Sequence, residues 1–220
     1  ALRGHYTAEL EQLRLQVEVM AVRVEENLDR MRLALEGDVA GVGAAAERVD
    51  RDVDAMNVSL TERCYELIAR EAPVASDLRL IVSVVRVLNE LERISDHAVR
   101  ICHDAAPVEL AHSDSRLYDL LVTMADEVVA RFHVARQAWG AMDRDLAEEL
   151  ANGSTLAEAL HARLIRELLD LHGPDAVGVA LRAAAVGRSL ERICDHTTII
   201  GARLRYLITG DPAHLAAETR

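Results

Sequence analysis

One heptapeptide of this chain occurs twice. Residues 91–97 read Leu-Glu-Arg-Ile-Ser-Asp-His and residues 190–196 read Leu-Glu-Arg-Ile-Cys-Asp-His, so six of the seven positions are identical. Each copy places a Glu and an Asp four residues apart. On a helix this spacing brings both carboxylates to one face, roughly 6 Å apart, where they repel by about 0.2–0.5 kcal/mol. Because the chain contains this repulsive pair twice, we expect a bound cation at each copy. A cation between two carboxylates replaces their repulsion by attraction to the ion.

Two further carboxylates lie in register with the first copy. Asp54 and Glu92 lie equally far before and after Pro73 in the sequence, and so do Asp50 and Asp96. In an antiparallel helical hairpin that turns at Pro73, residues equidistant from the turn meet, because both arms rise by about 1.5 Å per residue. The four carboxylates are therefore predicted to form a first metal site, since converging carboxylate oxygens bind hard cations.

The same construction in the second half gives three carboxylates. Glu158 and Glu191 lie almost equally far before and after Pro174. The position that faces Asp195 across a turn at Pro174 is near residue 154, which is a serine. Glu158, Glu191 and Asp195 are therefore predicted to form a second site that is completed by water, weaker in affinity, or empty, because cation affinity rises with ligand charge and count.

A purely structural interpretation competes with metal binding. In that case the carboxylates pair with Arg93, Arg192 or arginines of neighbouring helices in ordinary salt bridges. His97 and His196 lie about 100° around the helix from the preceding Asp, so we expect them to pack or hydrogen-bond at the flank of each site. Cys194 is expected to be a small inert residue.

The elements that must position these residues are helices. Half of the residues are apolar, only 3% are aromatic and four are prolines, a composition that predicts an all-α fold. The constant displacement between the two motif copies, which is close to half the chain, predicts two tandem, pseudo-symmetric three-helix bundles, residues 1–107 and 108–220. Their six long antiparallel helices are expected at residues 2–35, 38–71, 76–104, 113–142, 143–172 and 175–209.

Three positions carry more specific expectations. Asp38 is expected to be the N-cap of the second helix. Residues 152–154 (Asn-Gly-Ser) are expected to interrupt or kink the fifth helix. Glu92 interrupts an apolar line of residues seven apart, between Val85 and Val99. Its carboxylate should be partly desolvated and in need of a counter-charge.

Charge and hydropathy restrict the function. The net charge is −12, from 25 Lys and Arg against 37 Asp and Glu, so nucleic acid is not an expected partner. The chain has no apolar run long enough to span a membrane and no signal-like start, and its three cysteines show no paired spacing. These features predict a cytoplasmic protein with reduced thiols. With no nucleophile set, glycine-rich phosphate loop or zinc array, no enzyme is expected.

Over nearly its whole length the chain resembles the PhoU family of phosphate-specific transport system accessory proteins, which regulate phosphate uptake. The resemblance rests on four motifs taken together: the duplicated heptapeptide, Asp50-x-x-x-Asp54, Pro-Val-Ala-x-Asp-Leu-Arg at residues 73–79, and Tyr-Leu-Ile-Thr-Gly-Asp at residues 206–211.

Membership would imply two tandem three-helix bundles whose paired carboxylate motifs often hold multinuclear metal clusters, most often iron or zinc, with manganese or magnesium as alternatives. It would also imply frequent homodimerisation. The implied role is negative regulation of phosphate uptake and phosphate-starvation signalling, as an adaptor between the phosphate ABC transporter and a sensor histidine kinase at the cytoplasmic face of the membrane.

The motif residues carry over one by one. Asp50, Asp54, Glu92 and Asp96 match the first motif pair, and Glu191 and Asp195 match the second. The chain departs from the family where Ser154 replaces the first acid of the fifth-helix motif, leaving Glu158 as the second.

The alternative function is a carboxylate-bridged metal-storage protein or a di-iron, ferritin-like oxidase, which also builds its site from inward carboxylates on helices. Such enzymes use Glu-x-x-His, and neither motif copy has a His at that spacing.

Overall fold

The computed structural model describes residues 2–37, 40–103 and 114–219, and within these ranges it contains helices and no strands. The predicted all-α fold is therefore confirmed. The helices are α1 (Leu2–Leu35), α2 (Val42–Glu71), α3 (Ala75–His103), α5 (Ser115–Ala141), α6 (Arg144–Ala151), α7 (Thr155–Leu169), α8 (Ala176–Thr209) and the 3₁₀ helix η1 (Pro212–Thr219).

Helix boundaries follow the sequence signals with one clear exception. α5 begins after Asp114, whose carboxylate accepts hydrogen bonds from the backbone N–H groups of Arg116 and Leu117. The N-cap of α2 is Gly41, not Asp38 as the sequence predicted. Asp38 itself lies outside the described residues. α2 begins after Gly41, a left-handed residue with φ of 74°.

The predicted fifth helix is divided into α6 and α7 at residues 152–154. Gly153 adopts a φ of 78°, and the Ser154 hydroxyl caps α7 by accepting a hydrogen bond from the Ala157 N–H at 3.0 Å. A buried guanidinium from α5 completes the break, because Arg131 donates to the carbonyl oxygens of Leu150 at 3.0 Å and Gly153 at 3.2 Å. Leu150 O also accepts the backbone N–H of Gly153 at 3.0 Å, so the guanidinium adds to the backbone hydrogen bonds that end α6.

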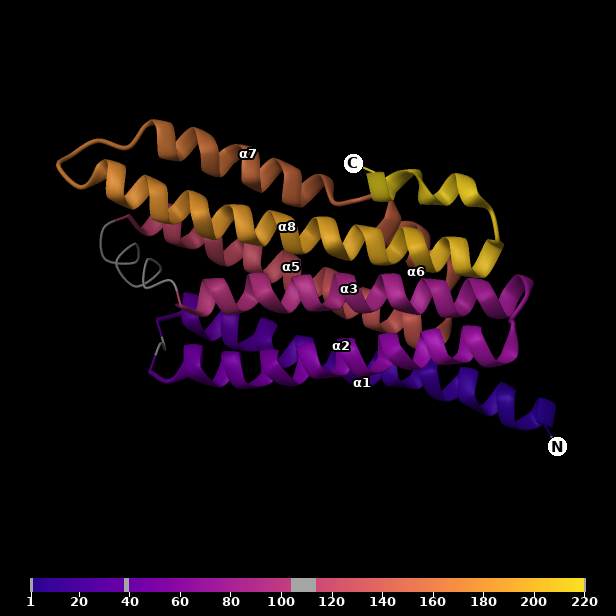
Figure 1. Ribbon diagram of the computed structural model, residues 1–220. Coiled ribbons are helices and arrows are strands. Elements are labelled where there is room, and N and C mark those ends of the chain that lie inside the picture. Colours follow the sequence, from indigo (N-terminus) through magenta and orange to yellow (C-terminus); the bar gives the residue numbers. More distant parts are fainter. Residues whose placement is uncertain (1, 38–39, 104–113, 220) are drawn as a thin grey trace.

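The two halves of the chain form one body with a shared core (Figure 1). α3 packs against α1 and α2 on one side and against α8 on the other, and α5, α6 and α7 in turn pack around α8. The α2–α3 and α7–α8 turns lie at opposite ends of the molecule, so α3 and α8 run antiparallel. A single cluster of buried apolar side chains extends through both halves.

The histidines of the two motif copies meet where α3 and α8 join. The rings of His97 and His196 stack with their centroids 5.7 Å apart. His196 Nδ1 lies 2.6 Å from the buried carboxylate of Glu90, which is also paired with Arg86 at 3.3 Å. Burial, with the neighbouring His196 next, lowers the pKa of His97 to about 4. The expectation that these histidines pack or hydrogen-bond at the flank of the carboxylates is confirmed.

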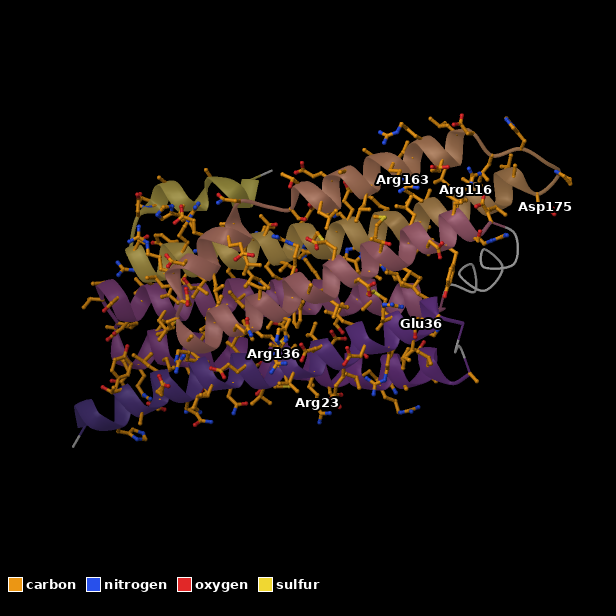
Figure 2. The ribbon with its side chains drawn as sticks, turned by 180° about the vertical axis from the view of Figure 1, so that it is seen from behind. Arg23, Glu36, Arg116, Arg136, Arg163 and Asp175 are labelled. Carbon is orange, nitrogen blue, oxygen red and sulfur yellow. The ribbon has the colours of Figure 1, made fainter. Side chains whose placement is uncertain are left out.

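A second polar contact joins the halves through α1 and α5. Arg136 of α5, labelled in Figure 2, pairs through its guanidinium with Glu25 of α1. His133, one turn earlier on α5, also lies 3.5 Å from the Glu25 carboxylate. None of the described helices is long and apolar enough to cross a membrane.

Residues of two of the sequence motifs, Arg79 and Gly210, lie against each other at the end of α8. Gly210 terminates this helix with a φ of 73°, and its N–H donates to Tyr206 O at 2.7 Å. A Cβ at Gly210 would lie 2.9 Å from Nη1 of Arg79. The guanidinium from the start of α3 thus sits at the carbonyl end of α8, where the helix dipole favours a cation.

We expect Gly210→Ala to lower the free energy of unfolding by more than Gly153→Ala does. Both substitutions place a Cβ on a left-handed residue, at a cost of about 1–2 kcal/mol. A Cβ at Gly153 meets nothing within 4 Å, whereas one at Gly210 must displace Arg79. Urea unfolding of the two variants measures the difference, and equal losses would show that the contact with Arg79 contributes nothing.

Candidate functional site

The four carboxylates predicted for the first site lie on two helices that pack against each other, Asp50 and Asp54 on α2 and Glu92 and Asp96 on α3. Burial raises the pKa of Asp50 above its usual value, and the charges of Asp54 and Asp96 raise it further. Burial is also the largest cause that raises the pKa of Glu92, followed by Asp54 and Asp96. The structure therefore brings these carboxylates within electrostatic reach of one another, and Glu92 is partly desolvated, as the sequence predicted.

A chain of hydrogen bonds from α1 holds one of these carboxylates in place. The buried amide of Asn27 donates to Ala46 O and to Ser95 Oγ, both at 3.1 Å. Ser95 Oγ in turn donates to Asp50 Oδ1 at 2.6 Å. The sequence reasoning missed Asn27, although a polar residue inside the apolar stripe of the first helix was the available signal.

Basic partners are unevenly distributed in this cluster. Asp96 pairs with Arg100 at 2.7 Å, but both side chains are exposed, so the pair contributes little. Among the described residues, no ion pair joins Asp50, Asp54 or Glu92 to a basic side chain. The purely structural interpretation therefore accounts for Asp96 by a direct salt bridge, and for Glu92 only through the charge of Arg93, which lowers the pKa of Glu92 against the larger effects of burial and neighbouring acids.

The fit of this cluster to a metal ion rests on its donor chemistry. It offers only carboxylate oxygens, partly buried and carrying surplus negative charge, which suits a cation. In the described part of the chain, no three His, Cys, Asp or Glu side chains are grouped so that they could hold a metal ion. Metal binding by Asp50, Asp54, Glu92 and Asp96 stays a prediction.

The carboxylates predicted for the second site surround a pocket. Glu158 of α7 and Glu191 and Asp195 of α8 line it together with Ser154, and its volume is about 350 Å³. The structure thus brings the three predicted residues to one place.

More of the predicted carboxylates have a basic partner here than in the first cluster. Glu191 pairs with His161 at 3.2 Å and with Arg188 at 2.5 Å. Asp195 pairs with Arg192 at 3.2 Å. The predicted salt bridge to Arg192 therefore exists in this half, yet burial and the charge of Glu191 still raise the pKa of Asp195.

A carboxylate that the sequence reasoning missed is hydrogen-bonded to Ser154, one of the residues that line this pocket. The hydroxyl of Ser154 donates to Glu127 Oε1 at 2.7 Å, and Glu127 belongs to α5. The charge of Glu127 also acts on the thiol of Cys194. Burial raises the pKa of Cys194 to about 12; Arg131 opposes this, and Glu127 and Asp195 add to it. The thiol is therefore protonated at neutral pH, in agreement with its predicted inertness.

Comparisons with known proteins give one family for the whole chain. The model of the PhoU domain matches residues 17–105 and 121–204. The phosphate-specific transport system accessory protein PhoU of Serratia marcescens is 29% identical over 220 residues, which cover 99% of this chain and 90% of that protein. A PhoU homolog of Pseudomonas putida bearing the same name is 31% identical over 217 residues, 97% of this chain and 84% of that protein.

The crystal structure of PhoU from Pseudomonas aeruginosa superimposes with a TM-score of 0.85 at 29% identity, covering 94% of this chain and all of that one. The resemblance drawn from the motifs is confirmed. Since the domain model matches both halves and most of the sequence, the chain belongs to the PhoU family.

Proposed function

We propose that this protein is a regulatory accessory protein of a phosphate-specific transport system. The observation that carries the proposal is the match over nearly the whole chain to relatives that bear this name. In finer detail, the protein acts as a negative regulator, by docking between the phosphate ABC transporter and a sensor histidine kinase at the cytoplasmic face of the membrane. It works as a homodimer and carries out no turnover of its own.

The charge of the chain agrees with such docking. At a net charge of −12, the protein would meet its partners through their basic patches, which gives specificity and fast association more than affinity. The metal-storage or oxidase alternative draws no support from the three relatives described above, whose names describe an accessory protein or simply PhoU.

Metal binding is the second part of the proposal. Asp50, Asp54, Glu92 and Asp96 would hold the first ion or cluster, and Glu158, Glu191 and Asp195 the second, with iron or zinc first and manganese or magnesium as alternatives. When bound, the metal supplies positive charge that neutralises the carboxylates and ties together the helices carrying them. The assignment is supported by the mutual repulsion of these acids, because the charges of Asp54 and Asp96 raise the pKa of both Asp50 and Glu92.

Deletion of the gene in its own host is expected to derepress phosphate-starvation genes in phosphate-rich medium, because a negative regulator is lost. A phosphatase or reporter assay measures the response, and the wild-type gene supplied on a plasmid should restore repression. If the genes stay repressed and no paralogue covers the loss, the regulatory proposal is wrong and metal storage becomes the better explanation.

Asp50→Asn combined with Glu92→Gln is expected to abolish metal at the first site and to leave the bundle folded, because amides keep the shape but remove the charge. Metal content after loading with zinc or iron(II) measures the loss. Asp52→Asn with Glu62→Gln is the control, since it removes the same charge from exposed positions of α2. Unchanged metal content in the first variant would refute the ligand assignment.

The metal-free protein is expected to become less stable as pH rises through the range where the first cluster ionises. Burial and neighbouring carboxylates raise the pKa of Asp50 and Glu92 above the usual 3.8 and 4.5. The folded chain therefore holds protons that the unfolded chain has released, and stability falls with pH in that window. At pH values below the pKa values of these carboxyls in the unfolded chain, both states are protonated and this loss of stability is absent.

Urea unfolding of the metal-free protein, in buffer with a chelator, at pH 4 and pH 7 tests this dependence. The proteins compared are wild type, Asp50→Asn/Glu92→Gln and the control Asp52→Asn/Glu62→Gln. Asp50→Asn/Glu92→Gln should be more stable than wild type at pH 7, by at least about 0.2–0.5 kcal/mol for each like-charge pair relieved. Its advantage should shrink toward pH 4. An advantage that does not change with pH would contradict the prediction.

A further inference from the structure

The two motif helices expose apolar side chains at equivalent positions near their starts. On α3, Leu78 is 37% and Val82 is 45% exposed, and on α8, Val177 is 73% and Leu181 is 68% exposed. The displacement between the two pairs equals the displacement between the two heptapeptides. A single exposed apolar residue is ordinary. Exposure that recurs at the same positions of both halves indicates instead that these side chains meet something outside the chain.

Each apolar pair lies on the same face of its helix as the motif carboxylates. At about 100° per residue, positions 78, 82, 92 and 96 fall within a sector of about 80°, and so do the equivalent positions of α8. The carboxylates begin roughly 15 Å beyond the apolar pair, since the helix rises by about 1.5 Å per residue. The side chains of Asp96 and Asp195 are 44% and 49% exposed. Each helix therefore presents one stripe, which we define as Leu78, Val82, Glu92 and Asp96 on α3 and as Val177, Leu181, Glu191 and Asp195 on α8.

A pseudo-two-fold axis relates the two stripes. α3 and α8 run antiparallel, and the equivalent histidines His97 and His196 stack on each other. α1 likewise packs against α5, its counterpart in the second half. A half-turn about an axis through the histidine stack therefore exchanges the two motif helices. The stripes run in opposite directions, and the carboxylates of both lie beside the axis while the apolar pairs lie far from it.

Both stripes face the same side of the molecule. α3 packs against α1 and α2 as well as α8, and α8 packs against α5 and α7 as well as α3. The exposed sides of α3 and α8 therefore point away from α1 and α5. This is the side that faces the viewer in Figure 1, where α7, α8, α3 and α2 lie in this order from top to bottom. The two stripes thus share one surface, with an apolar pair at each end and the carboxylates near the axis.

The charge near the axis selects the chemistry of the partner. On α3, burial and neighbouring acids raise the pKa of Glu92, and Arg93 offsets this only in part. On α8, the same holds for Asp195 and Arg192. A Lys or Arg of a partner would supply the missing positive charge and bind in charge-assisted hydrogen bonds. A second copy of this chain does not fit this surface, because it would bring the same acids face to face.

We infer that the two stripes form one docking surface for a two-fold symmetric protein, each of whose subunits places apolar side chains on one apolar pair and a Lys or Arg against the carboxylates beside it. This inference rests on the proposed docking and names the surface and the kind of partner. Of the two partners proposed above, the transporter is the one that the names of the relatives specify. A two-fold partner binds both stripes at once, so the second contact forms at a high effective concentration.

The test measures binding of the detergent-solubilised phosphate transporter of the same host to the purified chain, in buffer with a chelator so that no metal competes for the carboxylates. Leu78→Ser/Val82→Ser and Val177→Ser/Leu181→Ser should each weaken binding by about tenfold or more, because either change turns a two-point contact into a one-point contact. The four substitutions together should abolish measurable binding. Asp96→Asn/Asp195→Asn should also weaken binding and make it less sensitive to salt, because the charges that attract the partner are removed.

Val19→Ser/Leu33→Ser is the matched control. This Val and this Leu are 48% and 44% exposed, and they belong to α1, which carries neither stripe. The control should bind the transporter to within about twofold of wild type, as expected for exposed positions outside an interface. Circular dichroism and thermal unfolding check that each variant is folded.

The outcomes separate the inference from the proposal beneath it. If the wild-type chain binds neither the transporter nor the sensor kinase, the proposed docking is itself wrong. If the wild-type chain binds the transporter and both apolar variants bind it to within about twofold of wild type, docking stands but uses another surface, and the inference is overturned. If the substitutions in only one stripe weaken binding, the two-fold partner is overturned. If the variants lose the kinase and keep the transporter, the assignment of this surface to the transporter is overturned.

Discussion

The packing of α3 against α8 constrains everything else in this molecule. Each of these helices lies in the core of its own bundle and also forms the contact between bundles, so polar groups on most of its circumference must be satisfied inside the protein. Glu90 and His196 meet this requirement by pairing with each other across the joint. Carboxylates that have no such partner are confined to the edges of the helix, where α2 or α7 approaches, and there they remain half-buried.

This confinement explains the electrostatic state of the clusters. A half-buried carboxylate close to others of its kind is costly in its charged form, and the raised pKa values of Asp50, Glu92 and Asp195 express that cost. A ligand that binds only the folded chain stabilises it in proportion to the logarithm of its concentration over Kd. Under the proposed metal binding, an ion would replace the repulsion between these carboxylates by attraction and would tie together the helices that carry them.

The two halves resolve the same packing problem with different residues. At the first cluster an amide and a hydroxyl, Asn27 and Ser95, orient one acid. At the second, Ser154 both caps α7 and holds Glu127, while Arg131 satisfies the carbonyls at the broken end of α6. Duplication followed by such exchanges keeps buried polar groups paired, because an unpaired one costs about 1–3 kcal/mol.

The sequence by itself determined the features that depend on local periodicity and on repetition. The all-α fold and, apart from the start of α2, the helices of the first half followed from apolar spacing and turn residues. The equal arms of one hairpin placed Asp54 where its charge acts on Glu92. The break at residues 152–154 was visible as a turn signal. Only the tertiary structure showed Arg131 inserted at that break, His97 against His196, and Arg79 against Gly210. Glu127 belongs to the same group, because its partner Ser154 lies on another element, far away in the sequence. Helical periodicity states which face of a helix is buried, but the docking of one helix on another decides what that face meets.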